Sequence, residues 1–194
     1  LESMGIKTSK NQKGSYTFDA SGIDSRFASY DLVKTMRASI MVLGPLLAKH
    51  GEAKVSLPGG CAIGARPVDL HIQGLEKLGA RIEIKDGYIL ATADRLIGSS
   101  YCFPRKSVTG TANILMAATL AEGETEIVNA ACEPEIVQLG ELLIAMGAKI
   151  EGLGRDCITI EGVENLVGAE IEIIPDRIEA ITMIIAGIIT QGEL

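Results

Sequence analysis

The residues best suited to chemistry lie in one loop, Leu57–Leu70, whose sequence is LPGGCAIGARPVDL. Three glycines around Cys61 let the backbone adopt positive φ angles and approach a ligand closely, while two prolines restrict where the loop bends. Two interpretations of the thiol stay open on the loop alone. Cys61 is either a small apolar residue buried by its neighbours, or a reactive thiol that Arg66, five positions away, helps to hold as a thiolate.

A second group of polar residues directly precedes the apolar segment that begins at Thr111. A helix N-terminus with cations and a hydroxyl is a natural phosphate site. The residues concerned are Arg105, Lys106, Ser107 and Val108. Arg37 stands just before another apolar segment, where the sequence alone indicates a surface charge at the start of a helix. Asp69 is compatible with a charge at a helix N-terminus, which the helix dipole favours.

The remaining cysteines and histidines have no spacing that indicates a site. The chain has no CxxC pair and only two histidines, so no zinc site is predicted, and we expect neither a metal nor a cofactor. The cysteines are interpreted as reduced thiols of a cytosolic protein. We interpret the following as packing or surface residues: His50, His71, Cys102, Cys132 and Cys157.

Composition restricts both the core and the partners. Of 194 residues, 47% are hydrophobic and only 4% aromatic, so a sizeable core has to be built from aliphatic side chains. The formal charge is −7 and no dense run of Lys or Arg occurs, which argues against nucleic-acid binding. Clustered arginines can still attract a small anion into a cleft. The longest apolar run, Ala180–Thr190, is too short to span a bilayer and predicts a buried helix rather than a membrane contact.

Glycines recur at regular intervals after similar segments. One series closes helical segments at positions 74 and 68 residues apart: Gly5, Gly79 and Gly147. Another follows apolar segments at positions 72 and 69 residues apart: Gly51, Gly123 and Gly192. Two markers with one interval predict a duplicated unit of about seventy residues.

Within a unit, the expected order is apolar helix, strand, loop, second helix and two-stranded hairpin. The hairpin turns fall near Lys85–Gly87 and Gly152–Asp156, and the Asp-Gly pair of the first is a favoured hairpin turn. Tyr88–Thr92 and Cys157–Ile160 alternate as half-buried strands do. Joined end to end, the units read βαβαββ, an α/β fold with its apolar helices buried centrally and its sheets outside. The repeat opens and closes within a unit, so we expect a fragment.

Several segments resemble the enolpyruvyl transferase family, and in particular its bacterial branch whose acceptor substrate is UDP-N-acetylglucosamine. The similarity covers nearly the whole chain and is most specific around Cys61. The segments that carry it are Tyr30–Leu70, Lys106–Val108, Ala117–Gly123, Glu133–Val137 and Pro175–Glu179. The resemblance implies an inside-out α/β barrel, or prism, of repeated βαβαββ units.

The resemblance also implies a reaction. An enolpyruvyl group would pass from phosphoenolpyruvate to the 3-hydroxyl of UDP-N-acetylglucosamine with release of phosphate, the first committed step of peptidoglycan synthesis, in the cytoplasm and without a cofactor. Two alternatives remain. One is 3-phosphoshikimate as acceptor, against which the cysteine loop and the Arg66–Leu70 run argue, and the other is a non-catalytic module that binds a nucleotide sugar.

Position by position, the family pattern implies roles for the candidates. Cys61 would be the general acid, able to add covalently to the substrate and to react with fosfomycin, and Arg66 would close over the phosphate. Arg37 would contact the UDP-sugar. The segment expected to receive the uridine nucleotide is Pro67, Val68, Asp69 and Leu70. The phosphate site before the apolar helix would hold the diphosphate through Arg105, Lys106, Ser107 and Val108.

The chain departs from the family pattern at Thr109–Gly110, where the family usually reads Gly-Ala. A β-branched residue at the expected glycine would alter how the backbone approaches the diphosphate. A further family motif, Asp176, Arg177 and Glu179, stands at the start of the third apolar helix, where we expect it to cap the helix.

The resemblance also predicts a division into domains. Residues 1–174 would form most of one enolpyruvyl transferase domain with its first unit incomplete, and residues 175–194 would start the following unit and lead into a second domain. Such a fragment would lack the family's opening Lys-Asn pair and the carboxylate that acts as base, so we expect it to be inactive alone. Its incomplete repeats expose apolar edges, which makes a homodimer a further hypothesis.

Overall fold

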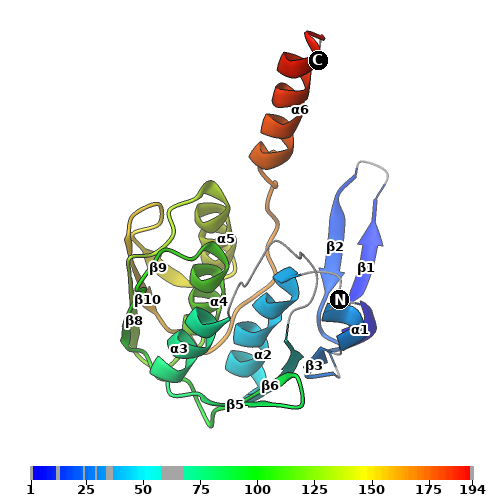
Figure 1. Cartoon of the computed structure of the whole chain (residues 1–194). Helices are drawn as coiled ribbons and strands as arrows, with labels where there is room; N and C mark the ends of the chain where they lie inside the picture. The colour runs from blue at the N-terminus through cyan, green and yellow to red at the C-terminus, as the bar shows by residue number, and fades with distance from the viewer. Residues whose placement is uncertain are drawn as a thin grey trace.

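The computed structural model describes residues 2–11, 14–23, 25–28, 30–33, 37–57 and 68–192. Within these ranges, the chain forms an N-terminal hairpin, two units of one topology and a C-terminal helix (Figure 1). The N-terminal part holds η1 (Glu2–Met4), β1 (Lys7–Lys10) and β2 (Tyr16–Asp19). Strands β1 and β2 pair antiparallel as a sheet of two strands.

The first unit contains one four-stranded sheet and the helices that connect its strands. Its elements are β3 (Phe27–Ala28), α1 (Tyr30–Val33), η2 (Arg37–Val42), α2 (Leu43–His50), β4 (Glu52–Ser56), α3 (Asp69–Lys77), β5 (Arg81–Lys85) and β6 (Tyr88–Thr92). The strand order is β3-β4-β6-β5, with β3 parallel to β4 and the other pairs antiparallel.

The second unit repeats this arrangement. Its elements are β7 (Ser100–Cys102), α4 (Val108–Ala118), β8 (Glu124–Val128), α5 (Pro134–Ala145), β9 (Lys149–Glu151) and β10 (Cys157–Glu161). The order β7-β8-β10-β9 has the same parallel first pair and antiparallel remainder. The predicted α/β class and the duplicated βαβαββ unit are therefore confirmed, whereas the closed prism stays a prediction.

Equivalent turns show why the sequence repeats where it does. Gly79 follows α3 and Gly147 follows α5, with φ of 92° and 104°, a region that residues with a Cβ rarely adopt. The first hairpin turns at Asp86–Gly87, where both φ values are positive, 51° and 79°, as the favoured two-residue hairpin turn requires. The glycine interval of the sequence thus marks one structural position in each unit.

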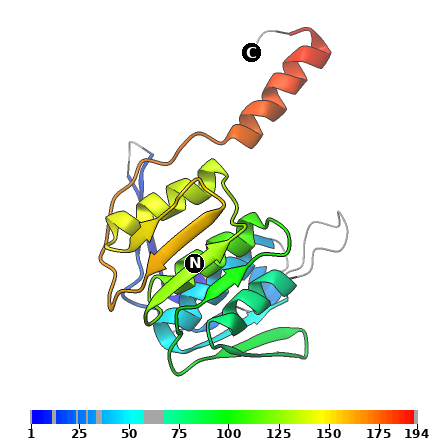
Figure 2. The same ribbon diagram turned by 90° about the vertical axis from the view of Figure 1, so that its left-hand side faces the viewer.

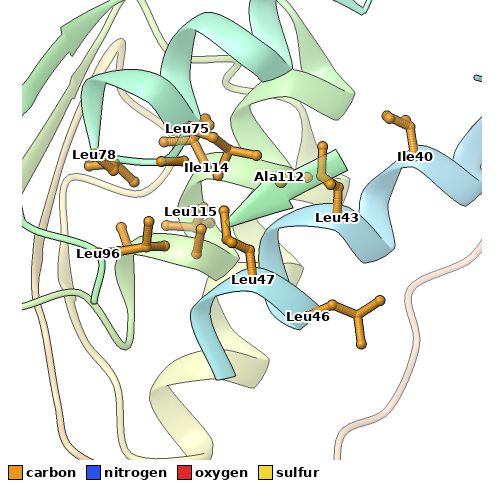
Figure 3. Close-up of a cluster of buried hydrophobic side chains, with 14 of the residues drawn as sticks. Ile40, Leu43, Leu46, Leu47, Leu75, Leu78, Leu96, Ala112, Ile114 and Leu115 are labelled. Atoms are coloured by element: carbon orange, nitrogen blue, oxygen red, sulfur yellow. The ribbon is translucent and has the colours of Figure 1, made fainter. Parts of the chain in front are cut away.

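The core lies between the two sheets, where α2 and α3 pack against α4 (Figures 1 and 2). It is aliphatic, as the composition requires, and Figure 3 shows side chains of α2, α3 and α4 meeting in it. Leu43, Leu75, Ile114 and Leu115 are fully buried. Central burial of the apolar helices is confirmed for α2 and α4.

Helix α6 (Arg177–Thr190) is the exception among the apolar helices. The predicted capping is confirmed, because the Asp176 carboxylate accepts hydrogen bonds from the backbone N–H groups of Ile178 (2.8 Å) and Glu179 (3.1 Å). However, none of its residues is buried, and the helix projects from the rest of the molecule (Figure 1). The predicted burial of Ala180–Thr190 is wrong for the described chain, because hydropathy identifies an apolar surface without showing which segment covers it.

The segment that leads to α6, residues 162–176, is held against α5 by one side chain. The Gln138 amide donates to the carbonyl of Glu172 (2.8 Å) and accepts from the N–H of Ile174 (3.1 Å). One turn earlier on α5, Glu135 accepts two hydrogen bonds from the Arg177 guanidinium, at 2.8 and 3.1 Å. The start of α6 is thereby fixed to the second unit.

Candidate active site

The predicted site residues belong to four segments. Cys61, Arg66 and Pro67 lie outside the described residues. Arg37 is the first residue of η2. Val68, Asp69 and Leu70 stand at the start of α3, and the run Arg105–Val108 leads into α4.

The structure brings the start of α3 next to the segment that precedes α4. Arg105 Nη2 lies 3.5 Å from Asp69 Oδ1, and the Tyr101 hydroxyl donates to the carbonyl of Leu70 at 3.3 Å. The two charged side chains remain partly exposed, 60% for Arg105 and 41% for Asp69, whereas Val68 and Leu70 are buried. Apolar neighbours therefore anchor a charged pair that solvent, or a ligand, can reach.

Burial keeps Tyr101 in its donor form. Its hydroxyl lies in the core, and burial, followed by the nearby Asp69 carboxylate, raises the pKa of Tyr101 above its usual value. The protonated hydroxyl can therefore hold the Leu70 carbonyl over the whole physiological pH range.

The N-terminus of α4 favours negative charge. Ser107 caps the helix by accepting from the N–H of Gly110 (3.1 Å), and the first turn carries no acidic residue. Arg105 precedes it, and Lys106 points its Nζ at Cys132 Sγ, 3.5 Å away. Two cations beside the positive end of a helix dipole are suited to a phosphate group. The Ser107 hydroxyl is already used as the cap.

The local structure accounts for the unusual Thr109–Gly110 pair. A Cβ at Gly110 would lie 2.7 Å from Ser107 Oγ and 3.0 Å from Phe103 Cε1, so a larger residue here would require these two side chains to shift. Thr109 is half-buried, and its hydroxyl lies 3.3 Å from His71 Nε2. The β-branched residue thus contacts α3 on one side of the anion-favouring turn.

A buried polar group beneath these segments was not found by sequence reasoning. His71 is buried, as its interpretation as a packing residue requires, and its Nδ1 lies 3.0 Å from Asn113 Nδ2. Asn113 itself is completely buried within α4. The signal was an amide inside the otherwise apolar run Ala112–Ala118, where a buried polar side chain requires partners.

The three described cysteines are not among the candidate site residues. Cys102 is exposed, Cys132 and Cys157 are half-buried, and all three are free thiols. Cys157 Sγ donates to Glu126 Oε1 at 3.5 Å, and burial, followed by this carboxylate, raises the pKa of the Cys157 thiol. It is therefore held protonated on the sheet of the second unit.

Among the described residues, no three His, Cys, Asp or Glu side chains are arranged to hold a metal ion. No helix in the described ranges is long and apolar enough to cross a membrane.

Known proteins similar to this chain are named as carboxyvinyltransferases or enolpyruvyl transferases. Residues 1–194 match the family model of EPSP synthase (3-phosphoshikimate 1-carboxyvinyltransferase). The UDP-N-acetylglucosamine 1-carboxyvinyltransferase of Hydrogenovibrio crunogenus is 54% identical over 192 residues, which is 99% of this chain and 46% of that protein. The protein of the same name from Koribacter versatilis is 64% identical over 167 residues, 86% of this chain and 39% of that protein.

Solved structures show the same fold at lower identity. The enolpyruvyl transferase NikO from Streptomyces tendae has a TM-score of 0.80 at 24% identity, over 96% of this chain and 44% of NikO. An EPSP synthase from Acinetobacter baumannii has a TM-score of 0.62 at 22% identity, over 86% of this chain and 38% of that one. The chain spans less than half the length of the relatives it matches, which agrees with the expected fragment.

Proposed function

The chain belongs to the EPSP synthase (3-phosphoshikimate 1-carboxyvinyltransferase) family, and from this we propose that it is part of a UDP-N-acetylglucosamine 1-carboxyvinyltransferase. The identity to curated relatives of that name carries the proposal, because it reaches 54% and 64%, whereas a solved EPSP synthase is 22% identical. Since the chain spans less than half of those relatives, the complete activity is proposed for the full-length protein that contains it.

In the proposed reaction, C-3 of phosphoenolpyruvate gains a proton and C-2 becomes electron-poor. The 3-hydroxyl of the sugar then bonds to C-2 and loses its proton to a base. The C–O bond to phosphate then breaks while C-3 returns one proton to the group that protonated it, so that the enol ether and inorganic phosphate leave. We assign the acid to Cys61 and the phosphate contact to Arg66, since such a transfer needs an acid and an anion clamp at one centre. The base would come from outside this chain.

We assign the UDP portion to the segments at the starts of η2, α3 and α4. Arg105 and Lys106 with the α4 N-terminus would neutralise the diphosphate, with Ser107 and Val108 completing that turn. Pro67–Leu70 would receive the uridine, and Arg37 would contact the sugar nucleotide. The contact of Arg105 with Asp69 supports one ligand across both segments, because it brings them within reach of a single nucleotide.

The proposal also covers the domain boundaries, the cellular location and the oligomeric state of the protein. Residues 1–174 would belong to one domain, and residues 175–194 would begin the next, which the projecting α6 supports. We place the reaction in the cytoplasm, where phosphoenolpyruvate is made. A homodimer of the isolated chain stays a hypothesis, and a monomer in sedimentation at high concentration would exclude it.

Phosphate release by the full-length protein tests the function. Turnover with phosphoenolpyruvate and UDP-N-acetylglucosamine, but not with 3-phosphoshikimate, is expected. The opposite acceptor preference would overturn the proposal in favour of an EPSP synthase.

A second measurement tests the isolated chain. Intact-mass spectrometry after incubation with fosfomycin, with and without UDP-N-acetylglucosamine, should show one adduct that maps to Cys61 and forms faster with the sugar nucleotide. Binding of the sugar nucleotide without any adduct or turnover, in the full-length protein as well, would instead support a non-catalytic binding module.

A further inference from the structure

One buried amide connects the elements that carry the proposed UDP-sugar residues. Asn113 Oδ1 accepts from the N–H of Gly44 in α2 (2.8 Å), and Nδ2 donates to the carbonyl of Ile40 in η2 (3.2 Å) and to His71 Nδ1 in α3 (3.0 Å). Asn113 lies in α4 and is completely buried. A single side chain therefore joins four elements.

Three of the four elements begin with, or follow, the proposed binding residues. Arg37 begins η2, Asp69 begins α3, and Arg105–Ser107 precede α4, which begins with Val108. They are far apart in the sequence, so their relative position depends on packing contacts such as this one.

The fit around the amide is close. A Cβ at Gly44 would lie 2.4 Å from Asn113 Oδ1 and 2.5 Å from the Asn113 carbonyl oxygen. Glycine at this position lets α2 approach α4 until its N–H reaches the amide. The hydrogen bond from Gly44 to Asn113 therefore depends on glycine at position 44.

The network also sets the tautomer of His71. The Gly44 N–H can only donate, so the Asn113 oxygen must face it and the amide NH₂ must face His71. His71 Nδ1 then accepts, which places the proton of the neutral ring on Nε2. Nε2 lies 3.3 Å from Thr109 Oγ1, so its proton is directed at the first turn of α4.

We propose that Asn113 and His71 are positioning residues for the nucleotide diphosphate. Asn113 orients His71, His71 donates to Thr109, and Thr109 fixes the turn whose N–H groups and neighbouring cations meet the diphosphate. The chain of contacts acts on the affinity for the UDP-sugar, without touching the reacting atoms. This proposal rests on the proposed function for its kinetic consequences, while the His71 tautomer is a property of the protein alone.

The kinetic experiment uses the full-length protein. Thr109→Val keeps the shape of the side chain and removes the hydroxyl, and it should raise KM for UDP-N-acetylglucosamine about fivefold, the equilibrium effect of one hydrogen bond. The change in kcat and in KM for phosphoenolpyruvate should stay within about twofold of that of the parent. Thr109→Ser, which restores the hydroxyl, should recover the parent KM. Equal effects of Val and Ser would overturn the proposal.

A stability control separates positioning from a general loosening of the fold. Ile158→Val deletes one methyl group from a fully buried residue of β10, a strand that carries none of the proposed binding or positioning residues. It should lower the melting temperature and leave KM for the UDP-sugar at the parent value. If it raises that KM as much as Thr109→Val does, the effect of Thr109 is structural and the proposal fails.

The tautomer is measured without any substrate. Long-range ¹H–¹⁵N correlation spectra of the histidine side chains should show His71 with its proton on Nε2. Asn113→Asp, which replaces the donating NH₂ by an accepting oxygen, should move a proton to Nδ1. A proton on Nδ1 of the parent His71 overturns the network even if turnover is normal. Absent turnover together with the Nε2 tautomer overturns only the proposed function.

Discussion

The two units share their order of elements and strands, and differ in the connection that follows the second strand of each sheet. In the first unit, twelve residues, 57–68, join β4 to α3, whereas in the second, five residues, 129–133, join β8 to α5. Since five residues suffice to connect the same elements, the fold does not require the other seven. The longer connection carries Cys61 and Arg66, so the residues to which we assign the chemistry lie in a segment that the shared scaffold does not require.

A second difference concerns equivalent ion pairs. In each unit, an acid in the first turn of the second helix meets an arginine near the start of the next apolar helix. Glu135 and Arg177 form two hydrogen bonds of 2.8 and 3.1 Å, whereas Asp69 and Arg105 make one contact of 3.5 Å. The tighter pair fixes a linker, and the looser pair leaves its charged groups available to a ligand.

The largest expected effect concerns the long connection. Cys61→Ala in the full-length protein should lower kcat by about 10²–10⁴-fold, the usual contribution of a general acid. The free energy of unfolding should change by no more than about 0.5 kcal/mol if the loop is an addition that the fold does not need. Phosphate release and urea denaturation measure the two quantities.

The control for that prediction lies in the other unit. Cys157→Ala removes a thiol from β10, and its kcat should equal that of the parent. Equal losses of kcat from both substitutions would mean that the chemistry does not depend specifically on the long connection of the first unit.

The next largest effect tests where the units join. Gly44→Ala places a methyl group 2.4–2.5 Å from two oxygens of Asn113, one of them in the backbone, and should lower the free energy of unfolding by about 3 kcal/mol. Gly168→Ala is the matched control, because a Cβ there meets nothing within 4 Å, and it should be nearly neutral. Urea titrations that give both variants the same midpoint would disprove the close α2–α4 contact.

A smaller effect tests the equivalence of the units directly. Gly79→Ala and Gly147→Ala both force a left-handed residue to carry a Cβ that touches nothing, so only backbone strain opposes them. Each should cost about 1–2 kcal/mol. The two losses, measured by thermal or urea denaturation, should agree within about 0.5 kcal/mol. A larger difference between the two losses would show that the two glycines, although equivalent in the sequence repeat, do not have equivalent local structures.

The smallest effect concerns the two ion pairs. Hydrogen bonds from Arg177 are the main cause that lowers the pKa of Glu135 below its ordinary value of 4.5. A carboxyl with a lowered pKa stabilises the fold above its unfolded pKa and loses that stabilisation as the pH falls through its folded value. The stability advantage of the parent over Glu135→Gln should therefore be constant near neutral pH, begin to fall as the pH approaches 4.5, and be lost once the pH is below the lowered folded pKa.

Denaturant melts of the parent and the variant at pH 7 and pH 3 give this difference. Because the pair is exposed, the advantage should be small even at pH 7. Asp69→Asn is the comparison: it should alter KM for the UDP-sugar more than stability. If Asp69→Asn and Glu135→Gln have the same pH-dependent effect on stability, the two pairs are equivalent and the distinction between them is wrong.

The sequence predicted the local structure of the fold well. Glycine intervals located the units, Asp86–Gly87 marked a hairpin turn, and Asp176 marked a helix start, because each of these features is decided within a few residues of chain. The burial of α6 was predicted wrongly, since the apolar character of a helix does not reveal its partner. Three-dimensional neighbours had to come from the structure.

For the candidate site, the sequence named residues but did not show how they are arranged. Asp69 and the run Arg105–Val108 were named from the sequence, but their adjacency depends on contacts between residues 36 positions apart. Asn113 was missed, because its partners are 42 to 73 positions away and an isolated amide in an apolar helix does not identify them. Long-range polar contacts of this kind leave only a weak mark on local sequence.

The strand order described above also has a consequence for synthesis on the ribosome. Each four-stranded sheet draws its strands from one continuous stretch, residues 27–92 for the first and 100–161 for the second. All strands of the first sheet have therefore been translated before the first strand of the second sheet is made. At about 10 residues per second, the second stretch follows some seconds later. The emerging chain can assemble one sheet at a time, with α4 arriving to join a first unit whose strands are already paired.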